Sequence, residues 1–242
     1  MSEINSEITN DIERYFVQQA QLYGADFYFS NKAIDFETMS SSSNVKKIEI
    51  LTQVAAQCHA CVSCGLARKR KQVVFGSGNE KANLMCVFGN PGSEEDQSGY
   101  FGVGAQGSLV SKILKAIEFE SNEIYQTSVV KCAPPNNRDS HVDERVKCMP
   151  YLLQQIDMIK PRFLLVFGEI AAQTILKSEK TLSQLRGSAH SIHNGIYVIV
   201  THHPGVLLRN NDLKRETWAD VQTLRSLYDE KIGDKGKFKH HK

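Results

Sequence analysis

Apolar and polar positions follow two alternating patterns from residue 84 onward. Four short runs are mainly apolar, as buried strands are: 83–89, 124–130, 162–168 and 195–201. Apolar residues recur at helical spacing between and after these runs, near 108–118, 142–159, 169–177 and 215–230. The alternation predicts a parallel α/β sheet covered by helices on both faces, with ligands bound at the carboxyl ends of the strands.

The first 43 residues carry a different pattern. Apolar residues between 4 and 23 follow one helical stripe, and a serine run at 40–43 is typical of a linker. A second helix is expected near 45–57. The sequence therefore predicts three parts: a helical extension with a Ser-rich linker (1–43), the main α/β domain (44–231) and a basic tail (232–242) that we expect to be disordered.

The composition is that of an ordinary globular protein. Of the 242 residues, 41% are hydrophobic and 23% are charged, which excludes collagen-like, low-complexity and wholly disordered chains. No apolar run approaches the roughly 20 residues needed to span a bilayer. The acidic start lacks the basic-then-apolar order of a secretory signal, so we expect a cytoplasmic protein that does not enter a membrane.

Charge is unevenly distributed. The formal total is +2, but residues 1–45 hold seven acidic and two basic side chains, a net of −5, so the remaining residues carry +7. The basic run 68–71 (RKRK) and the tail 233–242 (GDKGKFKHHK) contribute much of this excess. Such clusters are either solvated surface or contacts for a polyanion, and charge alone leaves both open.

Cysteines carry the first candidate chemistry, at positions 58, 61, 64, 86, 132 and 148. A disulfide framework is not expected in a reducing cytoplasm, and Cys86, inside a strand pattern, is most simply a buried hydrophobe. Segment 58–64 holds two overlapping C-x2-C pairs, each a half-site for zinc or an iron–sulfur cluster. Cys132 and Cys148 are candidates for the other half. The alternative is one C-x2-C pair with unrelated buried cysteines, and spacing does not choose between zinc and iron.

Two loops at predicted strand ends are candidates for ligand binding. Gly89–Gly92 and a glycine-rich stretch at 99–107 follow the first strand, where glycines let backbone amides approach a ligand, although a tight turn explains them equally well. The segment His202–Arg209 (HHPGVLLR) follows the last strand. Its histidines could stabilise a developing negative charge, or they could be ordinary polar loop residues.

In this order the motifs resemble the uracil-DNA glycosylase superfamily, specifically its iron–sulfur type, family 4. The resemblance runs from Cys61 to Tyr228 and rests on CxxCxLA, VVFGSGN, NPGSEED, VVKCAPPNNR, RFLLVFGEIAA, LRG and HHPGVLLR. It implies a three-layer αβα fold with a four-stranded parallel sheet. It also implies an enzyme that flips a damaged base out of single- or double-stranded DNA and hydrolyses its N-glycosidic bond. We expect it to act as a monomer.

The resemblance assigns roles to particular residues. Four cysteines would bind a [4Fe–4S] cluster, with zinc as the alternative: Cys61, Cys64, Cys132 and Cys148. His203 would donate a hydrogen bond to the uracil O2 as negative charge grows there. Three residues of the following segment would approach the DNA from the minor groove: Pro204, Gly205 and Arg209.

Around the first turn the sequence departs from the family pattern. Gly89 stands where the family has a carboxylate. Asn90 resembles instead the Asn-Pro-Gly turn of mismatch-specific relatives, in which an Asn side chain positions the water, and Pro91 and Gly92 complete that turn. The resemblance thus makes Asn90 the catalytic residue, with Gly89, Pro91 and Gly92 at the substrate.

The pocket positions depart as well. The family's stacking ring corresponds to Gly102, so Phe101 would supply a ring displaced by one residue. Ser128 stands where the family has the Asn that reads uracil, and serine cannot make the same two-pronged contact. A covalent-trapping relative has a His where this chain has Asn137, which argues against a suicide mechanism.

Two functions are therefore predicted. The first is an active DNA repair glycosylase for uracil or another deaminated base, with Asn90 orienting water and His203 assisting the leaving base. The second is a catalytically impaired DNA-binding member of the same fold.

Overall fold

The computed structural model describes residues 42–192, 195–236 and 238, with side chains from residue 50 onward. The chain divides into two compact units, residues 1–46 and 47–242. The helical stripe predicted over 4–23 lies outside the described residues. The helix expected near 45–57 is α3 (Ser42–His59), so the last two serines of the expected linker are helical. Within the described residues, no helix is long and apolar enough to cross a membrane.

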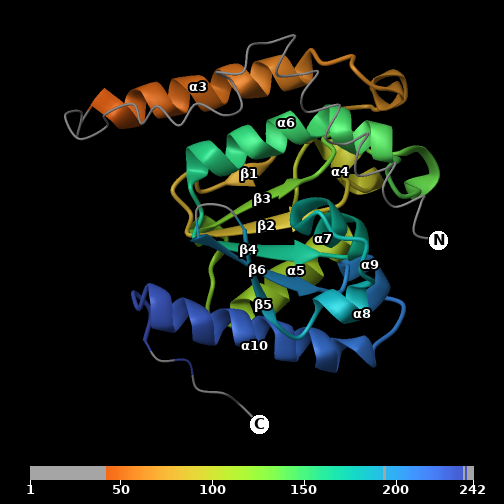
Figure 1. Ribbon diagram of the computed structural model, residues 1–242. Helices are drawn as coiled ribbons and strands as arrows, with labels where there is room; N and C mark the ends of the chain where they lie inside the picture. The colour runs from red at the N-terminus through yellow and green to blue at the C-terminus, as the bar shows by residue number, and fades with distance from the viewer. Residues whose placement is uncertain (1–41, 193–194, 237, 239–242) are drawn as a thin grey trace. The chain divides into compact units, whose positions relative to one another are not determined.

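The second unit is built on one mixed sheet of six strands (Figure 1). In spatial order the strands are β1 (Ser77–Gly78), β3 (Ile124–Ser128), β2 (Leu84–Phe88), β4 (Phe163–Phe167), β6 (Ile196–Thr201) and β5 (Ala189–Ile192). The central four are parallel, as predicted, and β1 and β5 pair antiparallel at the two edges. The prediction of a four-stranded sheet is therefore corrected to six strands.

Both edge strands carry weak sequence signals, which explains why four strands were predicted and not six. β1 has only two residues, one of them Gly78. β5 reads Ala-His-Ser-Ile and alternates between exposed and half-buried positions, so it lacks the apolar run of a buried strand. In contrast, every residue of β2 and β4 is buried.

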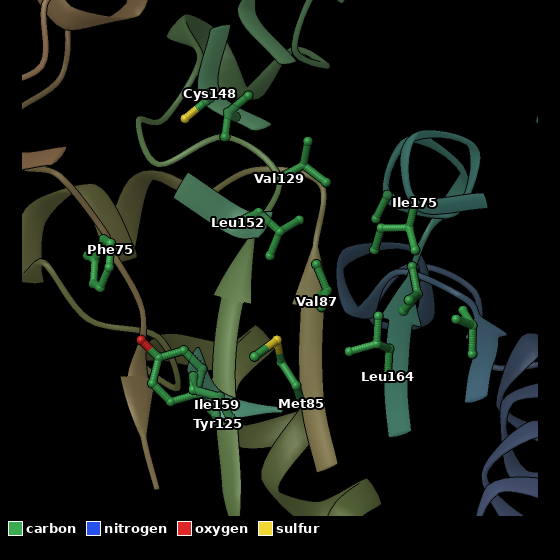
Figure 2. Packing of buried hydrophobic residues seen from close by; sticks show 14 of the residues in the cluster. Phe75, Met85, Val87, Tyr125, Val129, Cys148, Leu152, Ile159, Leu164 and Ile175 are labelled. Carbon is green, nitrogen blue, oxygen red and sulfur yellow. The ribbon is translucent and has the colours of Figure 1, made fainter. Parts of the chain in front are cut away.

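Helices cover the sheet on both faces, which gives the predicted αβα layering (Figure 1). One face packs against α3, α6 (Val142–Ile159), α7 (Glu169–Leu176) and α8 (Leu182–Leu185). Figure 2 shows this cluster, in which Met85 and Val87 of β2 join Leu152 of α6. The other face packs against α5 (Gly104–Ala116) and α10 (Leu213–Lys231). The described residues also form short helical segments: η2 (Gly65–Arg68), α4 (Ser93–Ser98), η3 (Ser121–Glu123), η4 (Pro135–Asn137) and α9 (Pro204–Leu207).

Strand register brings the loops that carry the candidate site residues to one end of the parallel strands. Phe88 at the end of β2 pairs with Ser128 of β3 and with Phe167 of β4, and Phe167 pairs with Thr201 of β6. The four parallel strands therefore end in one row. The loops that follow them leave the sheet side by side, which is where an open α/β sheet binds its ligands.

The start of the predicted basic tail contacts the domain. Lys235 Nζ lies 2.5 Å from a Glu123 carboxylate oxygen. The Arg225 guanidinium, fully buried, donates to the Gly236 carbonyl at 2.8 Å. These contacts attach residues 235 and 236 to α10 and η3.

Candidate active site

A cavity of about 560 Å³ opens at the carboxyl ends of the parallel strands. This volume is within the range of small-molecule sites. Eight of the residues predicted to act at the substrate or DNA line it: Gly89, Asn90, Gly92, Phe101, His203, Pro204, Gly205 and Arg209. They come from the loop after β2, the segment before α5 and the loop after β6, so the fold gathers three separated motifs around one space.

His203 is held with a defined proton position. It precedes α9, and its Nδ1 accepts a hydrogen bond from the backbone N–H of Gly205 at 3.2 Å. Since that N–H can only donate, Nδ1 is unprotonated and the neutral ring carries its hydrogen on Nε2. Burial lowers the pKa of His203, Asp139 partly opposes this shift, and Arg209 adds to it. The neutral ring is therefore the form present near neutral pH.

A glycine makes room for this histidine. Gly168, directly after β4, has φ of +88°, and a Cβ there would lie 3.2 Å from the Cβ of His203. A larger residue at position 168 would be strained and would press on the histidine. The segment after β4 thus leaves space for His203 at the cavity.

Asn90 has its amide nitrogen occupied and its amide oxygen available. The Nδ2 group donates to the Pro91 carbonyl at 3.3 Å, and the side chain is half-buried at the cavity wall. Nearby, the carboxylate of Glu95 accepts the Gly92 backbone N–H at 3.0 Å, and burial raises the pKa of Glu95. The Asn-Pro-Gly turn is therefore fixed by hydrogen bonds on both sides.

Three aromatic rings form one wall of the cavity. The Phe88 ring stacks on Phe101 with centroids 5.4 Å apart and on Phe167 with centroids 4.8 Å apart. It also meets the His203 ring edge-on, at 6.5 Å and 83°. Phe101 is held in turn by the close approach of α5, because a Cβ on Gly107 would lie only 2.1 Å from the Gly102 backbone. The wall offers a flat apolar surface to a base.

A network of ionic side chains lies between the end of β6 and α10. His202 Nε2 lies 2.8 Å from Glu216, which also contacts Arg186, and Arg186 pairs with Asp220 at 2.9 Å. Thr201, the last residue of β6, donates to Asp220 at 2.8 Å. This network joins the end of β6 to α10, and so it fixes the start of the His203 loop.

A second, much smaller cavity lies among the cysteines. Five thiols line it: Cys58, Cys61, Cys64, Cys132 and Cys148. The Arg70 guanidinium donates to Cys132 Sγ at 3.3 Å, and the Lys131 backbone N–H donates to Cys148 Sγ at 3.2 Å. In the described parts of the chain, no group of three or more His, Cys, Asp or Glu side chains forms a ready site for a metal ion. Thiols from three separated segments of the chain nevertheless line this one cavity.

Cys86 lies elsewhere, as predicted. It is fully buried within β2 and faces the α5 and α10 side of the sheet. Burial raises its pKa to about 12, so its thiol stays protonated.

Comparison with known proteins agrees with this geometry. A family model described as the uracil DNA glycosylase superfamily matches residues 75–222. The chain belongs to the uracil DNA glycosylase superfamily. Relatives named type-4 uracil-DNA glycosylase include one from Archaeoglobus fulgidus, 33% identical over 187 residues that make up 74% of this chain and 94% of the relative. One from Thermotoga maritima is 34% identical over 181 residues, 74% of this chain and 94% of the relative. One from Pyrobaculum aerophilum is 36% identical over 169 residues, 66% and 86% respectively.

Two residues predicted at the substrate lie away from the cavity of this uracil DNA glycosylase superfamily member. Pro91 is buried beneath the turn and does not line the cavity. Ser128 is fully buried, and its hydroxyl donates to the Val130 carbonyl at 2.6 Å instead of facing the cavity. The structure therefore does not bring Ser128 to a bound base.

Several cavity residues were not found from the sequence. Gln126, Gln106 and Asp139 line the cavity with Phe88. Gln126 is the one long polar side chain in the apolar run 124–130, and that contrast was an available signal. Asp139 gave none, because it lies in a polar loop where carboxylates are ordinary.

Proposed function

We propose that this chain is a DNA N-glycosylase that receives a flipped uracil, or another deaminated base, and hydrolyses its N-glycosidic bond. The observation that carries the proposal is the meeting of Asn90, His203 and Phe101 at one cavity, although they come from three separate segments. A hydrolytic water, a donor for the leaving base and a stacking surface are what this reaction needs.

His203 would stabilise the leaving base. As the bond from the sugar carbon to the base nitrogen breaks, its electron pair passes to the base, and in uracil negative charge grows on the oxygen beside that nitrogen. The Nε2–H of neutral His203 is the free donor of the ring, because Nδ1 is engaged by Gly205. A fixed donor at a site of developing charge is worth about 3–4 kcal/mol of barrier.

Asn90 would orient the attacking water. Its Oδ1 can accept a hydrogen bond from water while Nδ2 is held by Pro91. Water oxygen then bonds to the sugar carbon, and the proton it loses passes to solvent or to the departing base. Because an amide neither takes up a proton nor stabilises a cation as a carboxylate does, we expect slower excision than the family carboxylate at position 89 would give.

The thiols fit an iron–sulfur cluster, since thiolates are its ligands and all four assigned cysteines line one cavity. Cys61, Cys64, Cys132 and Cys148 would hold it, and Arg70 would donate to a ligand sulfur. When bound, the cluster supplies a structural cross-link, and the residues at the base cavity perform the chemistry. Zinc on the same thiols is the alternative outcome, and metal analysis separates the two.

DNA would lie across the mouth of the base cavity. Pro204 and Gly205 line it at the start of α9, and Arg209, exposed at the same rim, would contact a phosphate. Such contacts give affinity that depends on salt and little on sequence.

A strand-cleavage assay tests the proposal. The purified protein is incubated with oligonucleotides that contain one uracil, hypoxanthine or xanthine, single-stranded or paired, and abasic sites are cleaved with alkali. We expect product with at least one substrate, and a loss of about 10²-fold or more in Asn90→Ala and in His203→Ala. Asn122→Ala and His59→Ala, both at exposed positions outside the two cavities, serve as matched controls and should keep the wild-type rate.

The second candidate is a DNA-binding protein that has lost base excision. Gly89 in place of a carboxylate is the observation that favours it. It is supported if no substrate yields an abasic site while binding to DNA remains and falls with salt.

A further inference from the structure

Gln126 places an unused amide in the base cavity. Its side chain is half-buried and lines the cavity together with Phe101 and His203. Among the described residues, none makes a hydrogen bond with this amide. Its Nε2 passes 3.7 Å from the position a Cβ would take on Gly102, next to the aromatic wall.

The sheet explains why Gln126 reaches the cavity. In β3 it alternates with Thr127, whose hydroxyl donates to Gln155 on the other face. Gln126 and Ser128 therefore share the cavity-side face, next to Cys86 and Phe88 of β2. The Ser128 hydroxyl is already engaged by the Val130 carbonyl. Gln126 is thus the residue of this face that can offer a polar group to a ligand.

We propose that Gln126 reads the hydrogen-bonding edge of the base in the cavity, an inference that rests on the proposed function. A carboxamide offers one acceptor oxygen beside one donor nitrogen. This pair complements an N–H next to a C=O, the edge that uracil presents at N3 and O4 and that hypoxanthine presents at N1 and O6. Since both bases carry this edge, Gln126 can contact deaminated bases of both the pyrimidine and the purine class.

Thymine and guanine present the same edge, so the amide alone does not reject them. They are protected by their pairing and stacking in the duplex, since flipping costs least for a mismatched base. Cytosine and adenine present the reverse order of donor and acceptor, so they pair with the amide only after it turns over by about 180°. The cavity volume of about 560 Å³ leaves room for a purine as well as a pyrimidine.

The test compares Gln126→Leu, which keeps the bulk and removes both hydrogen bonds, with Gln126→Glu, which keeps the acceptor and removes the donor. Single-turnover excision is measured on uracil and hypoxanthine, together with inhibition by the free bases. We expect wild type to excise both bases. In Gln126→Leu, kcat/KM for both should fall about 10- to 100-fold, with a matching rise in the inhibition constants of free uracil and hypoxanthine. Gln126→Glu should fall at least as far as Gln126→Leu, because its second oxygen and its negative charge would face the carbonyl of the base. Ser128→Ala, on the same face but outside the cavity, should leave the free-base inhibition unchanged.

The outcomes separate this inference from the proposed function. If wild type excises bases and Gln126→Leu keeps its rate and its inhibition by free bases, the inference is overturned while the function stands. If wild type excises nothing, the proposed function fails, and fluorescence anisotropy with uracil- and cytosine-containing single strands decides the role of Gln126. Weaker binding of the uracil strand by Gln126→Leu than by wild type would support it, and equal binding by the two proteins would overturn it.

Discussion

At the scale of single residues, the site depends on which nitrogen of His203 carries the proton. The Gly205 N–H fixes the tautomer, and burial lowers the pKa of the ring. The Nε2–H donor is therefore carried by a neutral ring, and in the proposed reaction it would stabilise the negative charge that develops on the departing base.

The excision rate should respond to pH through this histidine. Because the pKa of His203 lies below its ordinary value near 6.5, the rate should stay level from pH 8 to below pH 6.5 and fall only at more acidic pH. There a proton on Nδ1 would meet the Gly205 N–H, and the contact would break. The folded state also loses stability over this range, because the folded pKa is the lower one and the unfolded chain takes up the proton first.

Single-turnover rates from pH 5 to 8 and ring nitrogen NMR check this prediction. His203→Gln retains an amide donor that does not titrate, so its rate should lack the acidic fall. A His203 midpoint above 6.5, or a neutral ring protonated on Nδ1, would contradict the assignment.

At this scale the sequence indicates which loops reach the cavity, because they follow strand ends, but it does not indicate which way a single side chain points. The turns at Asn90 and His203 follow strand ends, and the structure places both at the cavity. Ser128 was assigned by its position in a motif, yet its hydroxyl turns to the Val130 carbonyl. Gln126, two residues earlier on the same face, lines the cavity instead. Linear position did not reveal which side chain on that face a backbone carbonyl would engage.

At the scale of elements, long continuous patterns were predictable and short ones were not. The four parallel strands agree with the predicted runs, and α6 spans Val142–Ile159 as expected near 142–159. Its start is marked by Glu144, which accepts the His141 N–H at 2.7 Å and pairs with Arg138. β1 and β5 were missed because edge strands held by pairing need little apolar character of their own.

In the proposed cluster the cysteines would join three of these elements, so replacing one of them should release it. Cys132 follows β3, Cys148 lies in α6, and Cys61 and Cys64 follow α3. We expect Cys132→Ser to lose most of its iron and its visible absorbance, and to unfold at a temperature lower by roughly 10 °C, because three elements lose a cross-link.

Iron content, absorbance and thermal unfolding of the purified variants provide the measurement. Cys86→Ser is the matched control for metal content, because Cys86 is buried in the core away from this cavity. Cys58→Ser separates the fifth thiol from the four assigned ligands and should keep its iron. Wild-type protein that contains zinc and no iron would contradict the cluster assignment, and equal iron in Cys132→Ser would contradict the ligand set.

At the scale of the whole molecule, the two ends of the parallel strands differ, because the large cavity lies at the carboxyl ends. The carboxyl ends carry the cavity, with exposed Arg209 at its rim, whereas Arg162, equally exposed, precedes β4 at the opposite end. Charge in the sequence predicted a polyanion contact as one of two possibilities but did not say which basic residues would share a surface. Which basic residues share a surface depends on strand direction, which places residues 209 and 162 at opposite ends of the parallel strands.

The salt dependence of DNA binding distinguishes these two ends of the strands. Each phosphate contact releases counterions, so the logarithm of the binding constant falls with the logarithm of salt concentration by about 0.9 per contact on duplex DNA and about 0.7 on single strands. Arg209→Ala should therefore bind DNA more weakly at low salt, with a slope reduced by about one contact. Arg162→Ala removes the same charge from the amino ends of the strands and should keep the wild-type slope. Anisotropy titrations between 50 and 200 mM salt measure both. Equal slopes for Arg209→Ala and wild type would place the DNA away from the cavity mouth, because a duplex that delivers a base there must pass its backbone along this rim.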